Sequence, residues 1–149
     1  MRALLIALGN PLRRDDGVAQ AVLKLPIAPE TESRALFQLT PEVAAELAGF
    51  DPVIFIDADA SAADVIIEAV NEQSSIGAFT HFASPSEVVA LSRSLFGFAG
   101  QAFLCRIPAN DFSLGEGSGR RAESFVRLAA ERLRDLLAVH LSPQCEHSY

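Results

Sequence analysis

An apolar run of strand length at residues 3–8 ends abruptly at Gly9, and this opening constrains what the rest of the chain can form. Two adjacent carboxylates, Asp15 and Asp16, come next, followed by a segment at 18–25 with helical apolar spacing. A buried strand delivers its last residue to one edge of a sheet, and open α/β sheets carry their sites in the loops beyond that edge. Acids at the start of a helix also serve as an N-cap and a first-turn anion, so a purely structural role stays open.

Strand-like and helix-like segments alternate along the chain. Residues 52–57 are continuous, β-branched and aromatic, which is typical of a strand buried on both faces. Together with residues 3–8, the predicted strands lie at 34–39, 52–57, 64–70 and 101–107, and the predicted helices at 18–25, 41–48, 85–96 and 120–139.

This order predicts an α/β fold, a three-layer α/β/α sandwich around a mostly parallel twisted sheet of about five strands. The strand at 64–70 follows its predecessor after a short connection, so we expect it to be the one antiparallel strand. We expect one domain at 1–141 and a flexible C-terminal tail at 142–149.

Two helix starts carry clear signals. Thr40 is a candidate N-cap because Pro41 fits the first helical position. Residues 84–87, Ser-Pro-Ser-Glu, form a capping box, and Gly97 marks the end of the helix that follows. That helix is expected to bury Leu95, together with Val88 and Leu91.

Composition excludes several classes of partner. The 149 residues have a formal net charge of -7 and a pI of about 4.9, so neither nucleic acid nor an anionic membrane is expected to bind. The apolar run at 3–8 is too short for a transmembrane helix or a signal sequence, which predicts a cytoplasmic protein.

Cys105 and Cys145 do not make a disulfide framework, and Cys105 is expected to be a buried small hydrophobe.

Three possible metal ligands stand at comparable places: Asp16 after the first strand, Asp57 at the end of the third, and His81 shortly before a helix. Two carboxylates and one imidazole with open positions suit a divalent ion such as nickel or zinc. The purely structural alternatives are that Asp16 caps a helix, that Asp57 only ends a strand, and that His81 is an ordinary loop histidine. Sequence spacing leaves both interpretations open, because only the fold can bring three separate segments together.

A resemblance favours the functional interpretation. Residues 9–17, Gly-Asn-Pro-Leu-Arg-Arg-Asp-Asp-Gly, look like the opening signature of the hydrogenase maturation proteases, endopeptidases that trim the C-terminus of nickel hydrogenase large subunits. The strand end at 56–58 resembles the second motif of that family, and residues 80–91 resemble its third. The order and spacing of the motifs extend from residue 2 to about residue 139.

The resemblance implies an α/β/α fold and a peptidase whose catalytic and metal-contacting residues are Asp16, Asp57 and His81. It implies that the metal is nickel already installed in the partner, the hydrogenase large-subunit precursor, although zinc or cadmium could occupy the same ligands. The chain departs from the family pattern at Ala19, where glycine is usual, and at 37–42, where many members carry an Asp-Gly-Gly-Thr-like segment.

No Ser-His-Asp or Cys-His arrangement is visible in the sequence, which favours attack by a metal-activated water over a covalent nucleophile. Asp15 or Asp59 is a candidate for the carboxylate that takes the proton. Two alternative functions stay open. One is a nickel-checking or chaperone-like binding module without peptidase activity. The other is a nucleotide-binding domain, which the absence of a Gly-x-Gly-x-x-Gly or Walker loop makes weak.

Overall fold

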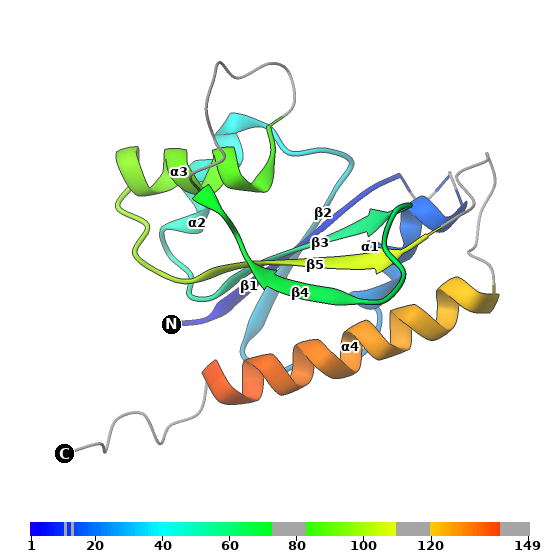
Figure 1. The fold of residues 1–149 in the computed structure, drawn as a ribbon. Helices are drawn as coiled ribbons and strands as arrows, with labels where there is room; N and C mark the ends of the chain where they lie inside the picture. The colour runs from blue at the N-terminus through cyan, green and yellow to red at the C-terminus, as the bar shows by residue number, and fades with distance from the viewer. Residues whose placement is uncertain (11, 13, 73–82, 110–119, 141–149) are drawn as a thin grey trace.

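The computed structural model describes residues 1–10, 12, 14–72, 83–109 and 120–140. A five-stranded sheet lies between two layers of helices (Figure 1). The strands are β1 (Ala3–Leu8), β2 (Thr31–Leu36), β3 (Val53–Asp59), β4 (Ile66–Ala69) and β5 (Ala102–Pro108). The helices are α1 (Val18–Val22), α2 (Ala44–Leu47), α3 (Pro85–Leu95) and α4 (Arg120–His140), and 3₁₀ turns at Arg14–Gly17 (η1) and Pro41–Val43 (η2) precede α1 and α2.

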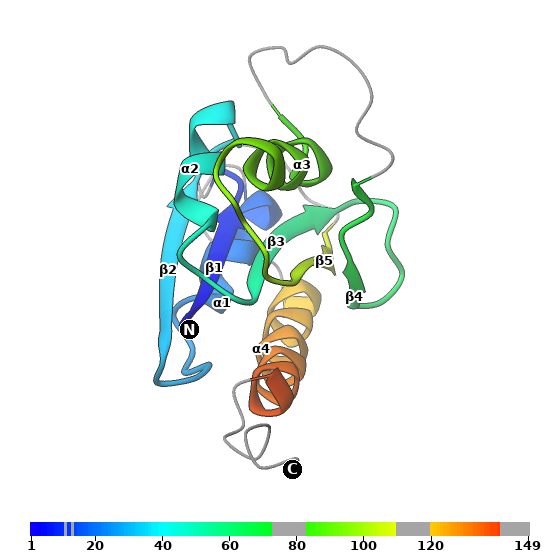
Figure 2. The ribbon, with the colours of Figure 1, turned by 90° about the vertical axis from the view of Figure 1, so that its left-hand side faces the viewer.

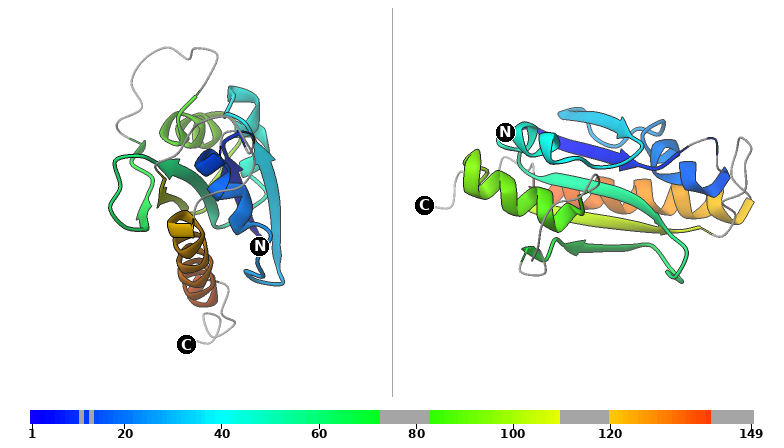
Figure 3. Two further views of the ribbon diagram at one scale, coloured as in Figure 1. Left: turned by 90° about the vertical axis from the view of Figure 1, so that its right-hand side faces the viewer. Right: turned by 90° about the horizontal axis from the view of Figure 1, so that it is seen from above.

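The strand order is β2-β1-β3-β5-β4, with every pair parallel except β4 with β5. Figure 3 shows this order from above. The chain leaves β1 toward one edge of the sheet to form β2 and then returns to the other side of β1 to form β3. The direction of winding therefore reverses between β1 and β3, and a crevice forms outside the carboxyl ends of the strands at such a switch point.

The expected α/β/α sandwich with one antiparallel strand is confirmed. The antiparallel strand does not pair with its predecessor, however, because β5 lies between β3 and β4. The parallel register of β3 with β5 covers the whole of both strands, from Val53 with Ala102 to Asp59 with Pro108. β4 is left on the edge of the sheet, where its half-exposed, partly charged sequence is tolerated.

Strand alternation divides the core into two layers. Odd-numbered residues of β1 and even-numbered residues of β3 face α1 and α4, while the intervening residues face α2 and α3. Figure 2 shows the two helical layers on opposite faces of the sheet. The first layer includes Leu5, Ile54 and Leu133, and the second includes Ile6 and Phe55.

Most predicted elements are found, with shifted ends. β2 ends at Leu36 rather than at residue 39, and α1 ends at Val22 rather than at residue 25. The helix predicted at 41–48 is a 3₁₀ turn followed by a single α-turn, and the Thr40 side chain makes no capping hydrogen bond. The expected stop at Gly97 is confirmed, because this residue has a φ of +74° just beyond the helix.

The inward face of α3 was predicted wrongly at one position. Leu95 is 67% exposed, while Val88, Val89 and Ser92 are buried. At about 100° per residue Leu95 returns to within about 20° of Val88, so its exposure comes from its place as the last residue of α3 and not from rotation about the helix axis. Cys105 is buried as expected, and burial raises the pKa of its thiol to about 12, which removes it as a nucleophile at neutral pH.

The helices that the structure describes include none long and apolar enough to span a membrane. The predicted tail at 142–149 lies outside the described residues.

Candidate functional site

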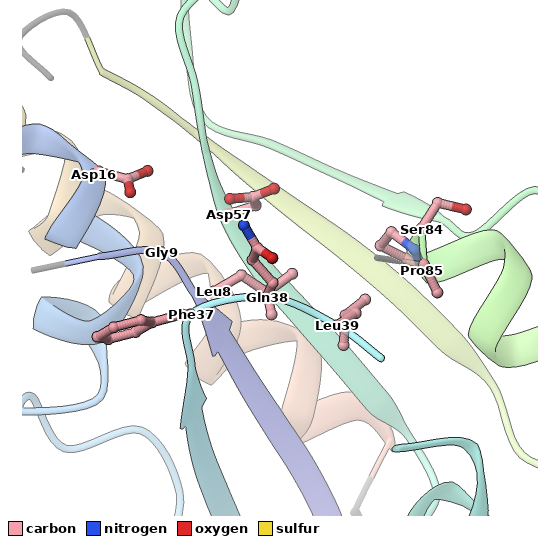
Figure 4. A pocket seen from close by; sticks show the side chains of 10 residues that line it. Leu8, Gly9, Asp16, Phe37, Gln38, Leu39, Asp57, Ser84 and Pro85 are labelled. Atoms are coloured by element: carbon pink, nitrogen blue, oxygen red, sulfur yellow. The ribbon is translucent and has the colours of Figure 1, made fainter. Parts of the chain in front are cut away.

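A pocket of about 400 Å³ opens at the carboxyl ends of β1 and β3, where the winding of the sheet reverses. Asp16 and Asp57 both line it, and Figure 4 shows their carboxylates on the same side of the strand ends. Gln38 also contributes, and in this view its amide points toward the Asp57 carboxylate. The fold thus brings two of the three predicted ligands together.

Asp16 is held in place by the backbone at the end of β1. Gly9 has a φ of +133°, and a Cβ added there would collide with the main-chain oxygen of Asp16. The Asn10 N–H donates to Asp16 Oδ2 at 2.7 Å, and Gln20 Nε2 donates to the Gly9 carbonyl oxygen at 2.8 Å. Glycine is therefore needed at position 9 for both its conformation and its lack of a side chain.

β3 carries Asp57 into the same pocket. Burial raises the pKa of this carboxyl from 3.8 to about 6; the hydrogen bond from the Ala58 N–H to Oδ1 opposes the shift, and the charges of Asp16 and Asp59 add to it. An ionised Asp57 is thus destabilised by loss of water and by like charge. A cation bound between Asp16 and Asp57 would relieve both effects, so the donor chemistry of the pocket fits a divalent ion.

The remaining walls come from the segment after β2 and from the start of α3. Phe37, Gln38 and Leu39 form the first wall, and Ala83, Ser84 and Pro85 form the second. The Ala83 N–H donates to the Leu39 carbonyl oxygen at 3.0 Å, which ties the two walls together. The predicted capping box is confirmed, because Glu87 N–H donates to Ser84 Oγ at 3.2 Å and Ser84 N–H donates to the Glu87 carboxylate at 2.8 Å.

His81, the third predicted ligand, lies outside the described residues. Among the residues that are described, no group of three His, Cys, Asp or Glu side chains could hold a metal ion. Ala83, two positions after His81 in the chain, lines the pocket.

The two acids suggested as proton acceptors are less suited to that role than the sequence implied. Asp15 is only 5% exposed and is not part of the pocket lining. Asp59 accepts hydrogen bonds from the hydroxyl and the backbone N–H of Ser61 at 2.7 and 2.8 Å, and Arg106 Nη1 lies 3.5 Å from its other oxygen. These contacts lower the pKa of Asp59 and make it a weaker base.

The sequence did not identify the wall residues as part of the site. The sequence predicts Phe37, Gln38 and Leu39 as part of the second strand, because the apolar pattern continues past the end of β2 at Leu36. Ser84 and Pro85 are predicted as a helix start within the segment 80–91 that resembles the third family motif, but neither is predicted to line the site. Their position in the chain is the feature that could have identified them, because a residue just after a parallel strand or just before the next helix lies at the carboxyl edge of the sheet.

No family model matches this sequence, and a search of curated proteins finds no match. Several solved structures match along nearly the whole chain. One, the hydrogenase maturating endopeptidase HybD from E. coli, has a TM-score of 0.69 and 18% identity over 94% of each chain. A [NiFe] hydrogenase maturation protease HybD from Thermococcus kodakarensis has a TM-score of 0.71 and 20% identity, over 91% of this chain and 99% of that one.

An uncharacterized protein from Wolinella succinogenes has a TM-score of 0.66 and 23% identity, over 93% of this chain and 99% of that one. At these identities the matches show a shared fold. The chain therefore has the fold of the hydrogenase maturation endopeptidases, as its motifs had indicated.

Proposed function

We propose that this protein is an endopeptidase that removes the C-terminal extension of a nickel-loaded hydrogenase large-subunit precursor. The observation that carries the proposal is the placement of Asp16 and Asp57 in one pocket at the β1/β3 switch point, on a fold shared with hydrogenase maturation proteases. The motif resemblance covers the same residues. Within this proposal His81 completes the set of three, as the resemblance of residues 80–91 to the third family motif implies.

Nickel enters this proposal as part of the substrate. Two carboxylates and one imidazole are too few and too open to make a closed metal cage. They could instead add to the coordination of an ion that the precursor already holds through stronger thiolate ligands. The mutual repulsion of Asp16 and Asp57 makes the pocket responsive to a positive charge, so the bound nickel would report that the precursor is ready for cutting.

For the hydrolysis step we propose that a water molecule attacks the scissile carbonyl. A metal ion can polarise that carbonyl or lower the pKa of the water, and a carboxylate in the pocket takes the proton. Cys105 is buried, so the described residues offer no cysteine nucleophile as an alternative.

The test incubates the protein with precursor before and after nickel insertion and follows release of the C-terminal peptide by mass spectrometry. We expect release only from the nickel-loaded precursor. His81→Ala should abolish release with little change in melting temperature, while the control His140→Ala, on α4, should keep it. Equal release from both precursors would overturn nickel recognition. Tight binding of the loaded precursor without any release would favour the nickel-checking binding module.

A further inference from the structure

The pocket has an apolar side as well as a carboxylate side. Leu8, Leu39 and Pro85 line it together with Phe37. Leu8 and Leu39 are buried in the core layer below, but Phe37 is 64% exposed. Figure 4 shows the Phe37 ring at the edge of the group of labelled side chains, below Gly9 and Asp16 in that view.

Phe37 differs from the other large hydrophobic side chains that are exposed among the described residues. Met1, Leu12, Leu95, Phe96 and Val139 are also exposed, and none of them lines this pocket. Isolated exposed apolar residues need no explanation. An aromatic ring beside two catalytic candidates is a different case, because exposed aromatic rings at binding sites supply large contact area at a low cost in conformational entropy.

The backbone on both sides of Phe37 is fixed. The Gly9 N–H donates to the Leu36 carbonyl oxygen at 3.0 Å, and the Leu39 carbonyl oxygen accepts the Ala83 N–H, also at 3.0 Å. The first bond ties the residue before Phe37 to the Asp16 loop, and the second ties the wall to the start of α3. The exposed ring is therefore presented on a rigid support, which lowers the cost of ordering it against a ligand.

Charge limits what can lie against this ring. Asp16 and Asp57 face the same pocket and already repel each other, so an acidic segment would be rejected. An uncharged, extended peptide could place its scissile bond near the carboxylates and a neighbouring side chain on the ring.

On the basis of the proposed function, we propose that Phe37 is a specificity-determining residue that packs against an apolar side chain next to the scissile bond of the precursor. Phe37 provides contact area in the bound state and takes no part in bond breaking. Its loss should therefore weaken substrate binding without slowing the chemical step.

The test measures KM and kcat for the nickel-loaded precursor with Phe37→Ala, Phe37→Leu and the control Phe96→Ala, which removes a ring that is 46% exposed at the end of α3. We expect Phe37→Ala to raise KM about tenfold or more with kcat within about twofold, since the lost apolar contact is worth at least a factor of ten in affinity. Phe37→Leu should recover part of the loss, and Phe96→Ala should match the wild type.

A KM for Phe37→Ala equal to that of Phe96→Ala would overturn the inference, and so would a loss confined to kcat. If the wild type does not cut the precursor, the proposed function fails, and affinity for the intact precursor can then be measured directly. Weaker binding by Phe37→Ala would still support the contact, and unchanged or undetectable binding would overturn it.

Discussion

Asp57 is the residue in which stability and function conflict most directly. It ends up in a pocket that removes water from its carboxylate and places Asp16 close by, and both effects act against its charged form. Shifted pKa values of this kind are typical of functional sites, where the surroundings of an ionisable group disfavour its usual protonation state.

Replacement of this carboxylate should make the protein more stable at neutral pH. The folded pKa of about 6 is above the ordinary value of 3.8, so the folded state keeps its proton over a range where the unfolded state has lost it. Stability contributed by this group is full below about pH 4 and is lost as the pH rises through about 6. Asp57→Asn should therefore unfold in urea with a free energy about 1–3 kcal/mol above the wild type at pH 7.5.

At pH 4 the gap between Asp57→Asn and the wild type should largely close. The same variant should no longer process the precursor, because the pocket has lost one of its two carboxylates. If the difference in free energy of unfolding between Asp57→Asn and the wild type is the same at pH 4 and pH 7.5, burial of the charged carboxylate does not destabilise the protein.

Gly9 is the second residue on which the site depends. Gly9→Ala should lower the free energy of unfolding by roughly 2–4 kcal/mol, because the new methyl group meets the backbone of Asp16 and the φ of +133° is strained for alanine. Gly49→Ala is the matched control, since an added Cβ there meets nothing within 4 Å. Denaturant titration measures the free energy of unfolding of both variants. Similar free energies for Gly9→Ala and Gly49→Ala would refute the close contact between position 9 and the backbone of Asp16.

At the scale of elements, the start of α3 links helix stability to the shape of the pocket. Ser84 closes the capping box and also lines the pocket, and the backbone of Ala83 is bonded to the segment after β2. A helix start that frays would therefore move one wall of the site.

Loss of the capping side chain should show this connection. Ser84→Ala should destabilise the protein by about 1 kcal/mol, because the Glu87 N–H loses its partner. Ser94→Ala, on an exposed serine in the last turn of α3, should change stability by less than about 0.5 kcal/mol. Thermal unfolding of the two variants tests the difference, and an equal effect would mean that the box contributes nothing.

The sequence predicted the elements well where their signals are local. The capping box and the stop at Gly97 fix α3, and the long apolar stripe fixes α4. The end of β2 was placed three residues too late, because the apolar pattern runs on after the last strand hydrogen bond. Pairing with β1 ends at Leu36, and no local property of Phe37 reveals that end.

At the scale of the whole molecule, the two core layers have different relations to the site. Among the residues that the structure describes, the layer between the sheet and α1 and α4 contributes none to the pocket lining, while the layer under α2 and α3 contributes Leu8 and Leu39. Damage to the first layer should therefore affect stability more than chemistry.

Leu133 tests this separation, since it is fully buried on α4. Leu133→Ala should cost about 2–5 kcal/mol in the free energy of unfolding through the lost contacts and the cavity. Leu95→Ala, on a leucine that is 67% exposed, should change it by less than about 0.5 kcal/mol. Below their melting temperatures both variants should process the precursor as the wild type does. A processing defect in Leu133→Ala in the folded state would show that the two layers are coupled.

The order of strands and helices by itself determined the α/β/α sandwich, because alternating periodicity leaves few ways to bury every apolar face. It also placed Asp16 after the first strand and Asp57 at the end of the third. Only the tertiary structure decided that β1 and β3 are neighbours, that β5 separates β3 from β4, and that Phe37 stands exposed beside the carboxylates. Pairing between strands distant in sequence depends on long-range contacts, and a burial-driven pKa shift such as that of Asp57 depends on everything packed around the group.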